Sequence, residues 1–264
     1  MDSFKLTDYS ALTVGLVPFT LILFLIDIST DFKLSHILAL YPSAPLKFDL
    51  NALSFYPFLH KNIIHWILNI TSLGYLLNNF EKTHGTIYTG VTLNLLTVIS
   101  GLQYCLLGSI LFQNTHVIGL SGLVFSFMAF YAVKESESRP ILFQFKVNSR
   151  EIIIPTKYSP FIWLFAIALI IPGSSFFGHL TGITTGYLLV YKKINFLYPS
   201  SKIILFIEKK VAPLITFLKK IVNFVTEEDG ANLRTVNYVP FLSTDLEINT
   251  DSTFRGPGHV VGTE

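Results

Sequence analysis

The sequence has few charged residues for its length. Of 264 residues, only 19 are Lys or Arg and 17 are Asp or Glu, whereas 51% are hydrophobic and 24 are Phe. The mean hydropathy is +0.54. No stretch typical of a linker occurs before about residue 200. Because the apolar side chains outnumber those that one water-soluble core buries, we expect a membrane protein.

Three further scarcities exclude other classes of protein. The net charge is only +2 and dense basic clusters with interleaved aromatic residues are missing, which argues against a nucleic-acid-binding protein. The single cysteine, Cys105, lies in an apolar run and excludes an internal disulfide framework or a cysteine-based metal site. No H-E-x-x-H sequence occurs, and we expect neither a metal nor another cofactor.

Six apolar runs predict membrane-spanning helices. They lie at residues 11–28, 63–80, 88–112, 120–133, 160–171 and 176–191. The runs are continuously apolar, whereas membrane strands alternate. The fourth and fifth are shorter than the roughly 20 residues of a full span, which indicates a water-accessible cavity at membrane depth. No basic segment precedes the first run and no cleavage site follows it, so we expect it to be retained.

The distribution of Lys and Arg predicts the orientation, because basic loops stay on the cytoplasmic side of a membrane. With six spans, one side receives Lys5, Lys82, five basic residues at 134–157 and all those after residue 191. The other side receives only Lys33, Lys47 and Lys61. We therefore expect both termini in the cytosol.

The chain divides into three predicted regions. Residues 1–195 form an all-α membrane domain of six transmembrane helices. Residues 196–226 mix apolar residues with Lys pairs and a Pro, which is typical of an amphipathic helix on the membrane surface. A seventh span there would bury Glu208, Lys209 and Lys210. Residues 227–264 are polar and aperiodic, and predict a disordered cytosolic tail.

Polar side chains inside the apolar runs are candidates for function, because they are costly in lipid. His65 and Asn69 are four residues apart and share a face of the second helix, and His60 lies one irregular turn earlier, at the non-cytoplasmic entrance. The pair presents two hydrogen-bond donors on one face. By themselves, such residues also serve to hold helices together or to bind a buried water.

Two glycine-containing sequences carry one further candidate each. Gly119-Leu120-Ser121-Gly122 begins the fourth run, and small residues at 122, 126 and 129 continue along one face. His179 in the sixth run follows Gly178 and shares a face with Gly182 and Gly186. Either sequence alone is also typical of close helix packing. A lone histidine is equally a structural residue or part of a proton path.

Together these residues supply the groups that serine hydrolysis needs, which are a nucleophile, a base and donors to the oxyanion. Ser121 is the candidate nucleophile and His179 the candidate base. His65, Asn69 and the backbone N–H of Ser121 are candidate oxyanion donors. The one carboxylate expected at membrane depth is Asp27, near the end of the first run, so a Ser–His dyad is favoured over a triad.

The ordered set of motifs resembles that of a rhomboid intramembrane serine protease. The motifs are H-x-x-x-x-H-x-x-x-N from His60 to Asn69, G-x-S-G from Gly119 to Gly122 and G-H-x-x-G-x-x-x-G at 178–186. The resemblance covers about residues 10–195, and residues 81–95 and 167–180 are similar to the fungal Golgi branch. It implies the six-helix rhomboid fold and cleavage of transmembrane proteins near the luminal membrane face of the Golgi. The site it implies consists of Ser121 as nucleophile, His179 as base, His65, Asn69 and the Ser121 amide at the oxyanion, and His60, Gly119, Gly122, Phe125 and Gly182 in support.

Two positions depart from the family pattern. Rhomboids usually carry a Tyr four residues after the serine that stacks on the histidine, and this chain has Phe125, which keeps the ring. We expect the stacking to survive. The Trp-Arg signature of the first luminal loop has no match between Thr30 and Leu59, so that loop is expected to differ in shape.

Two other functions remain open. A catalytically silent rhomboid-like adaptor would hand membrane clients to degradation machinery, but such members commonly lose the serine or the histidine, and both are present here. A transporter or channel would carry paired acids or bases in several spans.

The C-terminal residues 254–262 resemble an SHP box, the F-x-G-x-G-x-x-hydrophobic-G peptide that binds the N-domain of the valosin-containing-protein type of AAA ATPase. Phe254 and Val261 are the apolar anchors, and Gly256 and Gly258 let the backbone lie flat on a partner. Val261 stands where Leu is more usual, and an idle Gly-rich terminus is the alternative.

Overall fold

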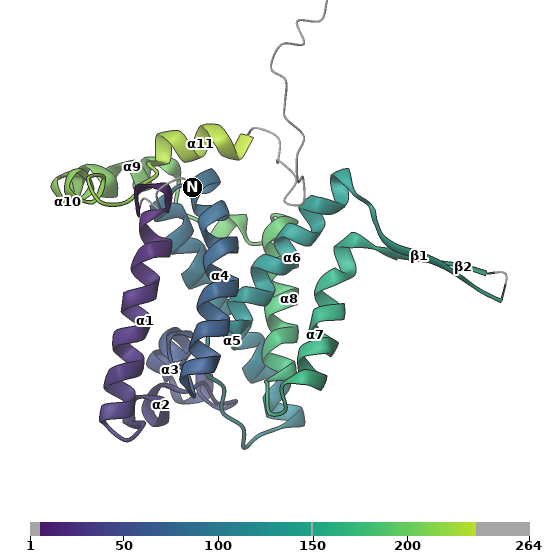
Figure 1. Cartoon of the computed structure of the whole chain (residues 1–264). Helices are drawn as coiled ribbons and strands as arrows, with labels where there is room; N and C mark the ends of the chain where they lie inside the picture. Colours follow the sequence, from purple (N-terminus) through teal and green to yellow (C-terminus); the bar gives the residue numbers. More distant parts are fainter. Residues whose placement is uncertain (1–5, 149, 236–264) are drawn as a thin grey trace, which may run out of the picture.

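Each of the six apolar runs forms a helix in the computed structural model, which describes residues 6–148 and 150–235. These helices are α1 (Ala11–Ser29), α4 (Ile63–His84), α5 (Thr86–Leu111), α6 (Ser121–Ser138), α7 (Ser159–Ile170) and α8 (Phe176–Val190). They lie side by side in one bundle (Figure 1). By length and apolar composition, two of the described helices, α1 and α5, qualify as membrane spans. The count of six spans therefore stays a prediction.

Shorter elements connect and flank the bundle. The connection from α1 to α4 contains α2 (Lys33–Leu38), η2 (Pro45–Lys47), α3 (Leu50–Phe55) and η3 (Tyr56–Phe58). The other single turns are η1 (Leu6–Asp8), η4 (Thr156–Tyr158) and η5 (Asn195–Leu197). After α8 the chain forms α9 (Ser201–Lys210), α10 (Ala212–Leu218) and α11 (Glu227–Thr235).

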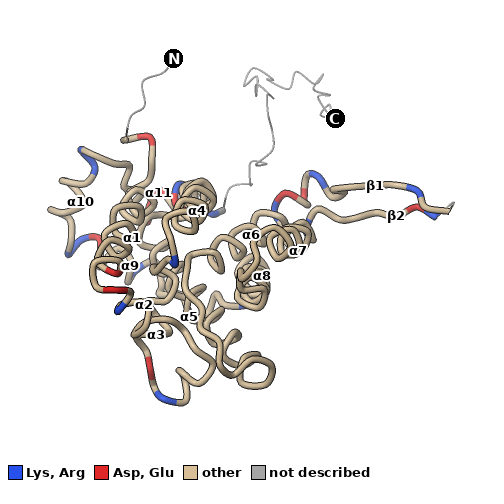
Figure 2. The backbone as a smooth tube through the Cα atoms, turned by 60° about the horizontal axis from the view of Figure 1, so that its bottom comes forward, with Lys and Arg blue, Asp and Glu red and all other residues tan. Residues whose placement is uncertain are grey.

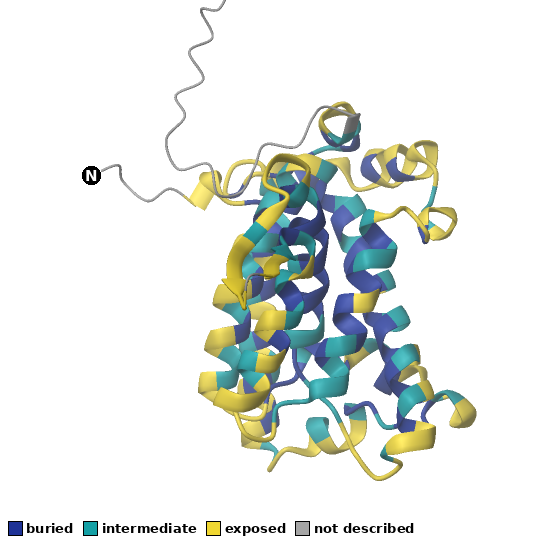
Figure 3. Ribbon diagram, turned by 90° about the vertical axis from the view of Figure 1, so that its right-hand side faces the viewer, coloured by how far each residue is buried: buried dark blue, intermediate teal, exposed yellow. Residues whose placement is uncertain are grey.

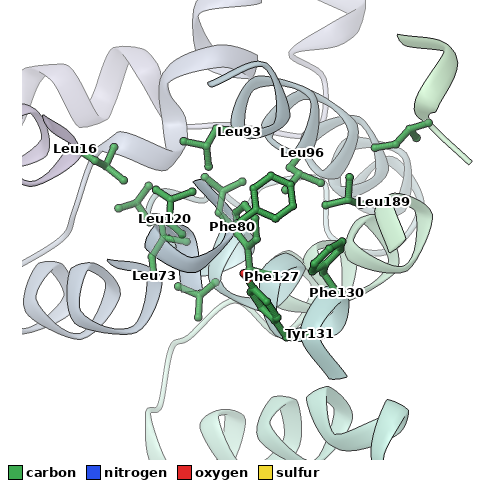
Figure 4. Packing of buried hydrophobic residues seen from close by; sticks show 14 residues of the cluster. Leu16, Leu73, Phe80, Leu93, Leu96, Leu120, Phe127, Phe130, Tyr131 and Leu189 are labelled. Atoms are coloured by element: carbon green, nitrogen blue, oxygen red, sulfur yellow. The ribbon is translucent and has the colours of Figure 1, made fainter. Parts of the chain in front are cut away.

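The core consists of leucine and phenylalanine side chains between α1, α4, α5, α6 and α8. Phe80 and Phe127 are fully buried, and their rings meet edge to face with centroids 5.1 Å apart. Figure 4 shows both rings among Leu73, Leu96 and Leu120. The helices turn buried residues toward one another and exposed residues outward (Figure 3). Charged residues gather at helix ends and on connecting segments, while the middle of the bundle is nearly free of them (Figure 2).

Helices α6 and α8 approach each other at glycines. A Cβ atom on Gly182 would lie 2.3 Å from the Gly122 carbonyl oxygen, and one on Gly186 would lie 2.1 Å from that of Ser126. These distances leave no room for any side chain. The Ser126 hydroxyl donates a hydrogen bond across the interface to the Gly182 carbonyl oxygen at 2.9 Å. Small residues thus let two backbones pack directly.

A buried carboxylate joins three helices at the opposite end of α4 from His65. Glu81 accepts hydrogen bonds of 2.8 Å from the backbone N–H groups of Leu12 and Thr13 and from the hydroxyls of Thr13 and Thr86. The first N–H groups of a helix have no acceptor within it, so the Glu81 carboxylate supplies acceptors for two of those in α1. This set of bonds fixes α1 to α4 and to the start of α5.

The prediction of an all-α fold is wrong in one region. Residues between α6 and α7 form a two-stranded antiparallel hairpin of β1 (Ile141–Val147) and β2 (Arg150–Pro155). Its sequence alternates Phe143, Phe145 and Val147 with polar residues, and β-branched and aromatic residues in alternation favour strands. The other regular elements among the described residues are helices, apart from two isolated bridges.

The prediction of disorder from residue 227 is also wrong for residues 227–235, which form α11. Arg234 pairs with Glu227 at 2.6 Å and lies 4.2 Å from the centre of the Tyr88 ring. Gly230 meets the backbone of His84 so closely that a Cβ there would lie 2.6 Å from it. Tertiary contacts therefore stabilise a sequence that has no apolar periodicity of its own.

The region between α8 and α11 departs in detail from the predicted single amphipathic helix. It breaks into α9 and α10 ahead of Pro213, where a proline ends the first helix and fits the start of the second. The Ala11 N–H donates to the Asn223 carbonyl oxygen at 2.9 Å, and the Asn223 N–H donates to that of Tyr9 at 3.0 Å. The beginning of α1 and the segment after α10 thus lie at the same end of the bundle.

We predict that Gly186→Ala lowers the free energy of unfolding by about 1–3 kcal/mol, because its methyl group would force α6 and α8 apart. Gly74→Ala in α4 is the matched control, since nothing lies within 4 Å of a Cβ there. The control gains helix propensity and should be stabilised by about 0.5–1 kcal/mol. Thermal denaturation in detergent measures both, and equal midpoints would contradict the packing argument.

Candidate active site

Ser121 and His179 are brought together where α6 and α8 begin. The Ser121 Oγ lies 2.9 Å from the Nε2 atom of His179, within hydrogen-bond distance. The two residues are 58 positions apart in sequence, so the close packing of α6 on α8 creates the contact. The geometry meets the requirement of a nucleophile next to a base.

Local hydrogen bonds hold the beginnings of both helices. Ser175 caps α8: its hydroxyl accepts a hydrogen bond of 3.1 Å from the N–H of Gly178, the residue before His179. Leu40 and Val117 exchange backbone bonds of 3.0 and 2.9 Å, which attach the segment before α6 to the α1–α4 connection. The Gly119 N–H donates to the Tyr56 carbonyl oxygen at 3.0 Å.

The His179 ring is held by stacking and not by a carboxylate. Phe125 stacks on it with ring centroids 4.5 Å apart and planes at 24°, which confirms the expected stacking. The Nδ1 atom of His179 is buried and has no hydrogen-bond partner in the described part of the chain. Asp27 is bonded instead to the backbone N–H of Ser35 at 3.0 Å and to the Ser35 hydroxyl. Among the described residues, the hydrogen bond of the His179 ring is therefore the one with Ser121.

His65 and Asn69 face the turn that precedes Ser121. Gly119 has φ +113°, which favours glycine. A Cβ there would lie 2.6 Å from His65 Cε1 and 3.3 Å from Asn69 Nδ2. The Asn69 Nδ2 atom is buried and lacks a hydrogen-bond partner among the described residues. An unpaired buried donor is costly, and a catalytic role is one of the explanations for such a group.

His60 supports this arrangement from the side. It is fully buried, and its ring meets that of His65 edge to face at 5.2 Å between centroids. Gly122 and Gly182 lie at the α6–α8 contact, one position after Ser121 and three positions after His179. The structure therefore brings together every candidate residue that the sequence placed in the helices.

A cavity reaches Ser121, and sequence analysis did not predict all of its lining. Tyr56, Tyr104, Val117 and Thr181 line it together with Gly119, Ser121, Gly122 and Gly178. The Tyr56 hydroxyl lies 3.1 Å from Ser100 Oγ and donates to the Thr97 carbonyl oxygen. Burial raises the pKa of Tyr56 to about 12, so this wall stays uncharged at neutral pH. Nothing in the sequence around Tyr56 marks it, because its place depends on the fold of the α1–α4 connection.

The bundle of apolar helices holds Ser121 and His179 within hydrogen-bond distance, which is the geometry expected of a serine hydrolase set among apolar helices. The Rhomboid domain model matches residues 47–196, more than half of the chain. The chain belongs to the rhomboid family, as the sequence motifs predict.

Similar relatives are fungal proteins named rhomboid-type serine protease 2. The one from Debaryomyces hansenii is 49% identical over 267 residues, which cover 97% of this chain and 93% of the relative. That from Candida albicans is 47% identical, with 96% and 92% covered, and that from Saccharomyces cerevisiae is 39% identical, with 96% and 94% covered. The protein is accordingly an intramembrane serine-type endopeptidase.

We predict that Gly119→Ala slows proteolysis on the order of 100-fold, because its methyl group would displace the His65 ring. Gly173→Ala separates this clash from backbone strain, since Gly173 also has a positive φ, +82°, but nothing within 4 Å of a Cβ. Turnover of a membrane substrate in detergent measures both variants. An equal loss in the two would show that strain alone matters.

Proposed function

We propose that Ser121 and His179 form the catalytic dyad of this protease. The observation that carries the proposal is the 2.9 Å contact between Ser121 Oγ and His179 Nε2. His179 accepts the hydroxyl proton while Oγ bonds to the scissile carbonyl carbon, and then returns the proton to the leaving amine as the peptide bond breaks. A water molecule releases the acyl group by the same two proton transfers in the second half of the reaction. A silent adaptor has no need of this hydrogen bond.

We assign the oxyanion to a site bounded by His65, Asn69 and the first turn of α6. The buried Nδ2 of Asn69 supports this assignment, since it is a donor with no acceptor among the described residues. The Ser121 N–H lies in the first turn of α6, where backbone N–H groups have no acceptor within the helix. Donors fixed before the reaction stabilise the developing negative charge without having to reorganise. His60 positions His65 through ring contact and is not itself a donor to substrate.

The proposed substrates are transmembrane proteins, cleaved near the luminal face of a Golgi membrane. The candidate site lies where α4, α6 and α8 begin or nearly so, away from α11 and from the beginning of α1 (Figure 1). The Lys and Arg distribution assigns the end that carries α11 to the cytosol. The site then faces the lumen, and water reaches it from that side.

We predict that Ser121→Ala and His179→Ala each abolish cleavage of a co-expressed membrane substrate, while expression and membrane insertion are retained. A fluorophosphonate probe, which reacts with activated serines, should label wild type and neither variant. Labelling that depends on both residues also distinguishes a protease from a silent adaptor. Cleavage retained by Ser121→Ala would rule out the dyad.

For the oxyanion donors, we predict that Asn69→Ala reduces kcat by about 10- to 1000-fold, because one donor to the transition state is lost. The fluorophosphonate probe should still label Ser121 in this variant, which checks that the dyad is intact. His60→Ala should show a smaller effect. Wild-type turnover in Asn69→Ala would refute the oxyanion assignment and leave the dyad standing.

The SHP-box-like sequence is a separate part of the proposal and lies outside the described residues. We propose that Phe254, Gly256, Gly258 and Val261 bind a valosin-containing-protein type AAA ATPase, which would help to extract or process membrane clients. The support is the ordered sequence match and the predicted cytosolic side of the C-terminus. Truncation after Ser252 leaves α11 complete, so the bundle should keep its cytosolic contacts.

We predict that pull-down of purified ATPase by full-length protein is lost on Phe254→Ala and on truncation after Ser252. Proteolysis by the two variants should equal that of wild type, because neither change reaches the dyad. Phe241→Ala, which changes a phenylalanine outside the motif, is the matched control. Equal ATPase recovery by all four proteins would remove this part of the proposal.

A further inference from the structure

The register of the β1–β2 hairpin sorts its side chains into two faces, because directly opposed residues of antiparallel strands point the same way. One face carries the pairs Phe143–Ile154, Phe145–Ile152 and Val147–Arg150, and the other carries Gln144–Ile153 and Lys146–Glu151. We call the five residues Phe143, Phe145, Val147, Ile152 and Ile154 the apolar face. The hairpin is thus amphipathic, with one charged and one largely hydrophobic side.

The apolar face is exposed. Phe143 is 55% exposed, and Phe145 and Val147 are each 46% exposed. The two strands are exposed along most of their length (Figure 3). An isolated two-stranded hairpin is at best marginally stable in water, and a contiguous exposed apolar surface marks an interaction site. Something outside the described chain therefore has to cover this face.

The hairpin is held sideways to the bundle. At its base the Thr156 N–H donates to the Pro140 carbonyl oxygen at 2.9 Å, and the Tyr187 hydroxyl donates to that of Lys157 at 2.6 Å. Figure 1 shows the strands projecting away from α6 and α7, across the direction of the helix axes. If the helices cross a membrane, this direction lies along the membrane surface.

We propose that the apolar face lies in the cytosolic leaflet, at the boundary between headgroups and acyl chains. This rests on the proposed orientation, which places the end of α6 and the beginning of α7 on the cytosolic side. After the hairpin, Tyr158 in η4 and Trp163 in α7 are about half exposed, as is typical of aromatic residues at membrane interfaces.

The charges also favour lipid over a protein partner. Lys146 and Arg150 flank the turn, and Arg139 and Lys157 lie at the base, which suits the anionic headgroups of the cytosolic leaflet (Figure 2). Arg150 shares the apolar face at its outer end, where a long side chain reaches the headgroups while its stem stays in apolar surroundings. The hairpin would hold the ends of α6 and α7 at a fixed depth.

The test places single cysteines at 143, 144, 145 and 146 in a Cys105→Ser background and attaches an environment-sensitive fluorophore. The labelled proteins are reconstituted in phosphatidylcholine vesicles containing phosphatidylserine, with nitroxide groups on the acyl chains. We expect blue-shifted, quenched emission at 143 and 145 and water-like emission at 144 and 146. Fluorophosphonate labelling of Ser121 checks that each labelled protein is folded.

Leu106 on α5 is 67% exposed, and the same fluorophore on a cysteine at position 106 reports whether the bundle itself is in lipid. Quenching at Leu106 without alternation in the hairpin would overturn the inference and leave the membrane orientation intact. No quenching at Leu106 would refute both. If the emission at positions 143 and 145 shifts to the blue only when a transmembrane peptide is added, the apolar face binds protein, and this result also overturns the inference.

Discussion

The direct backbone contact between α6 and α8 is the constraint on which the site depends. Gly182 and Gly186 leave no space for a side chain between the helices, and Ser126 adds a hydrogen bond across the contact. Because Ser121 and His179 lie at the beginnings of these two helices, the helix spacing sets the 2.9 Å between their reactive atoms. Association of helices in lipid gains little from the hydrophobic effect, so close packing of this kind supplies the attraction. The same few glycines therefore serve both stability and chemistry.

Sequence reasoning predicted the helices and most of the candidate site for a simple physical reason. A polar residue in an apolar run is conspicuous, and helical spacing already places His65 beside Asn69 and His179 beside Gly182. The cavity residue Tyr56 was missed because its position depends on how the α1–α4 connection folds back, through bonds such as that from Gly119 to Tyr56. Tyr104 was missed because it lies among other apolar residues of α5. The hairpin and α11 were missed for a related reason. Their sequences are mixed in composition, and contacts such as Arg234 on Tyr88 decide their structure.

At the end of the bundle that carries α11, several hydrogen bonds connect segments that are distant in sequence. Glu81 ties the beginnings of α1 and α5 to α4, and the Thr86 N–H donates to the Val225 carbonyl oxygen at 2.8 Å. The segment after α10 thus contacts the beginning of α5, next to the end of α4, and His65 and Asn69 lie toward the other end of α4. A chain that continues from α11 would leave the bundle from an anchored point, so a partner that pulls on the C-terminus would act first on contacts such as that of Gly230 with His84.

The Nδ1 atom of His179 is buried without a hydrogen-bond partner among the described residues, and this affects the enzyme before substrate binds. In the proposed mechanism the ring becomes positively charged when it takes the Ser121 proton, and the described residues hold no carboxylate against Nδ1 to stabilise that charge. The favourable counter-charge is the oxyanion that forms on a bound peptide in the same step. Proton transfer and carbonyl addition are then energetically linked, and without a peptide in place the serine remains a neutral alcohol. Such coupling confines activation of the serine to the moment when a carbonyl group occupies the site.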